Sequence, residues 1–111
     1  MNADTQTDAG IKTFAIPREM HAGVYRGAGH IARETVPVPE IHAGEVLIRV
    51  AACGICGTDV KKVLHNLVRP PQILGHEIAG TIVKTGIGVT RWRAGDRVVS
   101  FHHIPCGSCF Y

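Results

Sequence analysis

Seven residues, Cys53–Asp59, place the strongest constraint on this chain, because they read Cys-Gly-Ile-Cys-Gly-Thr-Asp. Two thiolates at this spacing can reach one metal ion, or one can bind while the other packs. The apolar residues Val60, Val63 and Leu64 follow at helical spacing and predict a short helix. Thr58 is expected to cap that helix, whose N-terminus favours the thiolate form of a nearby cysteine. The alternative is a pair of buried structural cysteines at a tight turn.

Composition predicts one small globular domain. The 111 residues are 45% hydrophobic and 19% charged, a balance typical of folded rather than disordered chains. The net charge of +3 is spread along the chain and aromatic residues make up only 5%, unlike the basic and aromatic surface of a nucleic-acid platform. No apolar stretch approaches the roughly 20 residues of a membrane helix. Neither nucleic acid nor a membrane is therefore expected as a partner.

The N-terminal residues and the cysteines predict a cytoplasmic location. Met1–Asp8 is polar and carries two aspartates, unlike a secretory signal peptide. In a reducing compartment four cysteines favour metal or redox chemistry over disulfides. A dithiol redox protein built on Cys53 and Cys56 is disfavoured, because no thioredoxin-like strand–helix–strand pattern surrounds the pair.

Short strands separated by glycine and proline predict a mainly β domain. Residues 1–18 are polar without a steady period and are expected to form a flexible tail. Strand-like stretches follow at Met20–Ile31, Glu45–Ala52, Ile78–Val83 and Arg97–Phe101. Pro37 and Pro39 are expected to break any strand pairing between the first two stretches. We expect a partly open β-barrel with one short helix after Cys53–Asp59.

A second polar cluster reads Gly75-His-Glu-Ile-Ala-Gly80. His76 can give a neutral imidazole nitrogen to zinc, and the neighbouring Glu77 can orient or transiently bind the metal. Cys56 and His76 would be two of the three protein ligands of a catalytic zinc, whose fourth position stays open. Taken alone, His76 fits a hydrogen-bonded core histidine at a strand start equally well.

A second cysteine pair, Cys106 and Cys109, lies near the C-terminus. The pair forms half of a four-cysteine metal loop, and exposed thiols there would be an oxidation liability, so we expect a truncated chain. Alternatively, both cysteine pairs close one tetrathiolate site, as in a zinc-ribbon-like module, although their separation exceeds the usual ~15–20 residues. The two interpretations differ at His76, which the four-cysteine module does not need.

Together these motifs resemble those of the zinc-dependent medium-chain dehydrogenases, the alcohol and polyol dehydrogenase superfamily. The resemblance covers about Met20–Tyr111. The segment Gly75-His-Glu-x2-Gly80-x5-Gly86-x2-Val89 matches that family's zinc signature, and Cys56–Asp59, Gly95–Val99 and Cys106–Cys109 follow in its order and spacing. The resemblance implies that residues 19–111 are the N-terminal portion of a GroES-like catalytic domain. Two more cysteines, a third catalytic ligand (cysteine or glutamate) and the dinucleotide-binding domain would then lie beyond Tyr111.

The resemblance also implies a role for each matching residue around the catalytic zinc. Cys56 and His76 correspond to two of its ligands, and Glu77 to an acid close to the metal. Asp59 corresponds to the carboxylate that fixes the His76 ring through its other nitrogen. Thr58 corresponds to the hydroxyl that takes the alcohol proton.

Other positions are read in the same way. Cys106 and Cys109 correspond to the first two ligands of a structural zinc, whereas Cys53 stands where the family has no ligand and is expected to be a small buried residue. Lys61 stands where many members have the histidine that ends the proton relay. A lysine of pKa ~10.4 is a poor relay unless desolvated. Gly57, with the threonine and aspartate that follow it, favours the polyol and amino-alcohol branches.

The implied activity is hydride transfer between an alcohol, preferably secondary or a polyol, and NAD or NADP. Zinc polarises the alcohol oxygen and lowers its pKa, and the nicotinamide accepts the hydride. The full-length protein is expected to be a homo-oligomer. The 111-residue chain alone is expected to be inactive, because the third ligand and the nucleotide domain are missing.

Overall fold

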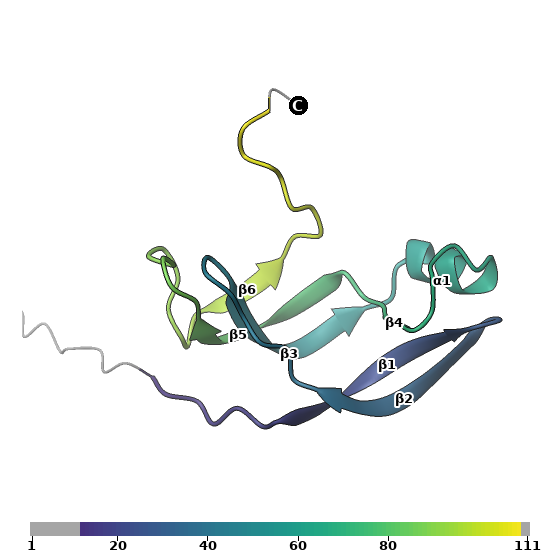
Figure 1. The fold of residues 1–111 in the computed structure, drawn as a ribbon, viewed down its shortest axis with the longest axis horizontal. Helices are drawn as coiled ribbons and strands as arrows, with labels where there is room; N and C mark the ends of the chain where they lie inside the picture. The colour runs from purple at the N-terminus through teal and green to yellow at the C-terminus, as the bar shows by residue number, and fades with distance from the viewer. Residues whose placement is uncertain (1–11, 110–111) are drawn as a thin grey trace, which may run out of the picture.

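The computed structural model describes residues 12–109, so residues 1–11 of the predicted tail lie outside the described part. The elements are β1 (Glu19–Gly27), β2 (His30–Pro37), β3 (Val46–Gly54), α1 (Gly57–Leu64), β4 (Gln72–Ile73), β5 (Glu77–Thr85) and β6 (Arg97–Ser100) (Figure 1). The predicted mainly β fold with one short helix is confirmed.

The strands form two antiparallel sheets of three strands each. The first sheet has the order β2-β1-β4, and the second sheet has the order β3-β5-β6. No strand of one sheet pairs with a strand of the other within residues 12–109, so the two sheets are not closed into a barrel there. None of the described helices is long and apolar enough to cross a membrane.

The first sheet is anchored by Tyr25 of β1, whose side chain is fully buried. The Tyr25 hydroxyl donates a hydrogen bond to the Asn66 side chain, just beyond α1, and so ties the sheet to the end of the helix. The stretch predicted at Met20–Ile31 is broken by a turn between β1 and β2, where Ala28 has a φ of +50°. Pro37 ends β2, as its missing N–H group predicts.

In the second sheet, β3 and β5 pair from Val46–Thr85 to Gly54–Glu77, so the end of β3 faces the start of β5. The ladder is irregular between Val50 and Ala52. The predicted apolar alternation is therefore interrupted, and the residues of β3 from Arg49 onward are exposed. This pairing brings the two polar motifs of the sequence to the same edge of the molecule.

Helix α1 begins earlier than predicted, because Cys56 rather than Thr58 is its N-cap. The Asp59 carboxylate reaches back and accepts the Cys56 N–H through Oδ2 at 3.0 Å, which fixes the first turn at that residue. Val63 is buried beneath the helix, whereas Leu64 is mostly exposed.

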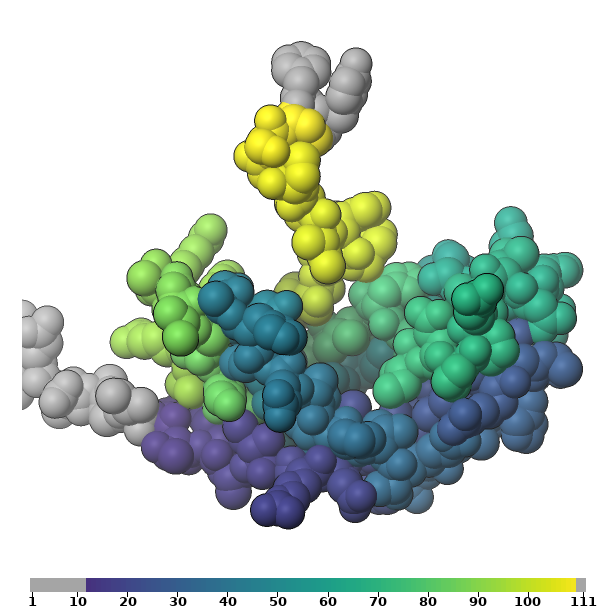
Figure 2. Space-filling view, in the orientation of Figure 1, coloured from purple at the N-terminus to yellow at the C-terminus, as the bar shows by residue number. Residues whose placement is uncertain are grey.

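The chain leaves the second sheet after β6, one residue earlier than predicted. Residues 101–109 have no regular structure and are exposed. Figures 1 and 2 show this yellow segment standing away from the two sheets. Val99 and Phe101, on either side of the strand end, are 82% and 76% exposed.

Residues 12–18 form neither helix nor strand, but they contact the second sheet. The Arg49 guanidinium of β3 lies over the Phe14 ring, 5.4 Å from its centre. The Lys12 side chain passes so close to Gly95 that a Cβ there would lie 2.8 Å from Lys12 Cδ. Lys12 and Phe14 thus lie against Gly95 and Arg49 of the folded domain.

Candidate metal centre

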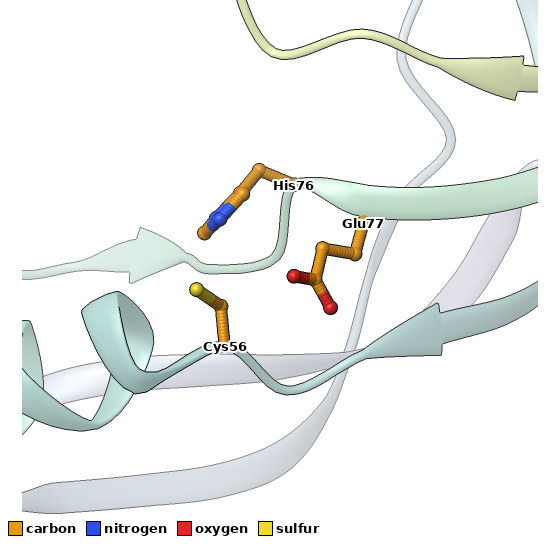
Figure 3. Close-up of side chains that lie close together, drawn as sticks. All are labelled: Cys56, His76 and Glu77. Carbon is orange, nitrogen blue, oxygen red and sulfur yellow. The ribbon is translucent and has the colours of Figure 1, made fainter.

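Three side chains meet where β3, α1 and β5 come together. One ligand atom each of Cys56, His76 and Glu77 lies within 4.8 Å of the others, and Figure 3 shows the three pointing toward a common space. Cys56 follows β3 as the N-cap of α1, while His76 and Glu77 stand at the start of β5. No other group of three such side chains forms within residues 12–109. Both residues predicted as catalytic zinc ligands, and the acid predicted beside them, are thus brought together.

The turn before His76 requires a glycine. Gly75 has a φ of +126°, a backbone conformation that side-chain-bearing residues rarely adopt. A Cβ on Gly75 would also lie 2.7 Å from Sγ of Cys53. Cys53 was predicted to be buried, but the residue is exposed because the second half of β3 is uncovered. Its sulfur instead packs against the turn that delivers His76.

The Asp59 carboxylate contacts both Cys56 and His76. The side chain is buried, Oδ2 accepts the Cys56 N–H, and Oδ1 lies 3.3 Å from His76 Nδ1. Oδ1 is buried and makes no hydrogen bond of good geometry among the described residues. A protonated Nδ1 would satisfy this oxygen and leave Nε2 of His76 for a metal ion.

The Cys56 thiol is biased toward its thiolate. The Thr58 hydroxyl lies 3.5 Å from Cys56 Sγ. Hydrogen bonds from the Thr58 side chain, the Thr58 backbone N–H and His76, in that order, lower the pKa of Cys56, whereas desolvation and the Glu77 charge oppose them. A lowered pKa favours the form of cysteine that binds metals.

The donor set fits zinc. A thiolate, an imidazole and a carboxylate are all common zinc ligands, and Cys56 and His76 supply two of the three protein ligands that a catalytic zinc takes, with the Glu77 carboxylate beside them. The unsatisfied Asp59 oxygen behind His76 is the partner that a metal-binding histidine normally has. These residues can therefore hold a zinc ion and leave a position open.

Sequence reasoning did not place His102 at this site. Its ring centre lies 5.4 Å from that of His76, and the His103 ring centre lies 4.0 Å from that of His102 with the two rings tilted by 42°. The signal was the pairing of β5 with β6: because Ile78 faces Ser100, the same register continued two residues further brings His102 opposite His76. Sequence spacing alone does not give that register.

Cys106 and Cys109 lie on the exposed segment after β6, with their sulfurs 3.0 Å apart. The Cys109 thiol, with backbone N–H groups and Ser108, lowers the pKa of Cys106 to about 6. The pair forms no cluster with Cys53 and Cys56 among the described residues, so the four-cysteine module finds no support in the structure.

The chain matches a family model and several known proteins. The family model described as "Alcohol dehydrogenase GroES-like domain" matches residues 42–111, which include every predicted site residue. Sorbitol dehydrogenase of Bacillus subtilis (strain 168) is 41% identical over 102 residues, covering 87% of this chain and 29% of that protein. L-threonine 3-dehydrogenase of Pyrococcus furiosus is 45% identical over 80 residues, covering 68% of this chain and 23% of that protein.

The chain also matches a solved structure. The crystal structure described as that of "a putative zinc-binding dehydrogenase" from Sinorhizobium meliloti 1021 bound to NADP matches with a TM-score of 0.73 and 38% identity, over 82% of this chain and 27% of that chain. This chain thus spans less than a third of the length of each of these relatives. The chain belongs to the alcohol dehydrogenase GroES-like domain family, the family of the zinc-dependent medium-chain dehydrogenases.

Proposed function

We propose that this chain forms the N-terminal part of the catalytic domain of an enzyme that oxidises a secondary alcohol or polyol with NAD or NADP. The observation that carries the proposal is the convergence of Cys56, His76 and Glu77 within 4.8 Å. The sorbitol and L-threonine 3-dehydrogenase names of two relatives support a hydroxyl on a secondary carbon as the substrate group.

Cys56 and His76 would hold the catalytic zinc, with the Glu77 carboxylate beside them. When bound, zinc supplies a Lewis acid that makes an alcohol easier to deprotonate. Asp59 keeps the His76 ring in one orientation, since its carboxylate faces Nδ1 at 3.3 Å. The same buried carboxylate holds the Cys56 backbone, so both ligands depend on one residue.

Thr58 would carry the proton. Thr58 is exposed, and its hydroxyl lies 3.5 Å from Cys56 Sγ. A hydroxyl there can take a proton from a substrate and pass it to water. Lys61, on the next turn of α1, is exposed to solvent. The relay would end in solvent rather than at Lys61.

The remaining assignments extend the same proposal to the longer protein. Cys106 and Cys109 would supply two of four ligands of a structural zinc. The nucleotide would bind a separate domain of a cytoplasmic homo-oligomer. The 111-residue chain would not turn over alcohol, because a nucleotide site is needed for hydride transfer.

Zinc stoichiometry tests the proposal. We expect His76→Ala and Cys109→Ser to abolish binding of different zinc ions, with His30→Ala, an exposed histidine of β2, as the matched control. If Cys109→Ser removed all zinc while His76→Ala removed none, a four-cysteine module would replace this proposal. Activity is tested on the longer protein that contains this chain, with secondary alcohols and polyols and either nucleotide. Turnover by the 111-residue chain itself would contradict its assigned role as part of a catalytic unit.

A further inference from the structure

The Glu77 side chain on β5 fills the space that a side chain at Gly54 on β3 would occupy. Gly54 and Glu77 are direct partners at the end of the β3–β5 ladder. A Cβ built on Gly54 would lie 2.3 Å from Oε2 of Glu77 and 3.2 Å from its Cβ. The Glu77 carboxylate is therefore folded over the position that any larger residue at Gly54 would fill.

We propose that Gly54 is a positioning residue of the metal centre, because the space left by its missing side chain lets the Glu77 carboxylate reach Cys56 and His76. This inference rests on the metal centre proposed above and adds a determinant that has no ligand atom of its own. Gly54 would determine whether the Glu77 carboxylate is available to the metal ion, and it would take no part in the reaction.

The backbone does not require glycine at this position. Gly54 is not among the residues with a positive φ, in contrast to Gly75. Alanine can therefore adopt the Gly54 backbone conformation without strain. The requirement for glycine comes from the neighbouring side chain alone.

The atom that an alanine would meet at the shortest distance is also the one most able to move, whereas the Glu77 Cβ at 3.2 Å needs to shift by only a few tenths of an ångström. Oε2 is the far end of a flexible side chain, and the Glu77 residue is exposed, so a displaced carboxylate can turn into solvent. A Gly54→Ala change should therefore leave the strands in place and remove the carboxylate from the ligand group. Gly54→Ala should therefore weaken metal binding as Glu77→Ala does, although Glu77 itself is unchanged.

Cobalt titration of the chain tests this, with Cys106→Ser and Cys109→Ser in the background so that Co²⁺ reports on one site. We expect Gly54→Ala and Glu77→Ala each to weaken Co²⁺ binding by about 10–100-fold, the range for losing a supporting carboxylate. The double variant should bind no more weakly than Glu77→Ala. The visible cobalt spectrum should change in the same way in all three variants while thiolate coordination by Cys56 is retained.

Gly57→Ala is the matched control, because this glycine lies in the same motif and a Cβ there meets nothing within 4 Å. We expect the parent affinity and spectrum from it. Circular dichroism follows the fold; if Gly54→Ala unfolds while Gly54→Ala with Glu77→Ala folds and binds like Glu77→Ala, the clash is still demonstrated.

Cobalt binding by Gly54→Ala as tight as that of the parent would overturn the proposal. A loss of cobalt affinity in the double variant equal to the product of the two single losses would also overturn it. A parent chain whose cobalt binding is indifferent to His76→Ala would overturn the metal centre itself, and this inference with it. The two failures are thus told apart by the parent and His76→Ala titrations.

Discussion

Asp59 holds two predicted zinc ligands with its two carboxylate oxygens: Oδ1 lies 3.3 Å from Nδ1 of His76, and Oδ2 accepts the Cys56 N–H at 3.0 Å. Cys56 and His76 are far apart in the sequence, and Asp59 is the one buried charged residue in the described part of the chain. The ligand geometry and the start of α1 therefore depend on the same side chain.

Asp59→Ala should lose both contacts. We expect the free energy of unfolding to fall by about 1 kcal/mol, as for loss of a helix-capping carboxylate, and zinc affinity to fall about 10–100-fold. Asp59→Asn keeps an oxygen for the Cys56 N–H but no charge for His76, so it should lose mainly affinity. Urea unfolding and zinc competition titrations measure the two effects. Equal loss of stability in both variants would contradict the division of roles.

Gly75→Ala should destabilise the chain for two separate reasons. The φ of +126° strains any residue with a Cβ, and that Cβ would lie 2.7 Å from Cys53 Sγ. We expect a loss of roughly 1–3 kcal/mol from the backbone term, plus the cost of moving the sulfur. Adding Cys53→Ala should recover only the free energy lost by moving the sulfur, as measured by urea unfolding. Complete recovery would show that the backbone is not strained.

Thr58→Val should slow the reaction of Cys56 with iodoacetamide near neutral pH in the metal-free chain. The Thr58 hydroxyl bond is the largest cause that lowers the pKa of Cys56, so losing it raises that pKa and reduces the thiolate fraction. Thr58→Ser should restore the parent pH profile. Peptide mapping by mass spectrometry separates Cys56 from the other cysteines. A profile unchanged in Thr58→Val would contradict the assignment.

Cys106 should be alkylated fast at neutral pH. Its pKa is lowered to about 6, mainly by the Cys109 thiol, so the thiolate fraction rises through that pH and is nearly complete above it. Cys109→Ser should move the midpoint upward, because a major cause of the shift is changed. Cys53 provides an internal comparison in the same digest. A midpoint for Cys106 at the usual ~8.5 would contradict the geometry of the pair.

Zinc should stabilise the chain through the two ligand motifs. With free zinc at 100 times its dissociation constant, one site adds about 2.7 kcal/mol to the free energy of unfolding. Removing the metal with a chelator should reverse that gain, and His76→Ala should abolish the part due to the Cys56–His76–Glu77 group. Calorimetric unfolding with and without zinc measures it. An equal gain in parent and His76→Ala would place the metal elsewhere.

The parts of the site that could be predicted from sequence are those carried by contiguous motifs. Cys56 and Asp59 lie in one run, and His76 and Glu77 lie in another, so the residue types and their spacing already indicate the chemistry. The structure brings these four residues together. What the sequence could not give was the strand register that aligns the runs.

The differences have physical causes of the same kind. His102 approaches His76 only because β6 pairs with β5, a contact between distant segments. The helix start was misplaced because Asp59 reaches back to Cys56, a side-chain choice that helical periodicity does not show. Cys53 was predicted to be buried because the family has no ligand at that position, but burial depends on what covers β3.

The position of β6 has a consequence for handling the protein. This strand is at the edge of its sheet, with one side of its backbone unpaired by any described strand and the apolar Val99 82% exposed on it. Such an edge is a template onto which a strand of another copy can add. The short strand that carries His102 toward the metal centre is therefore also the place where self-association of the chain should begin as its concentration rises.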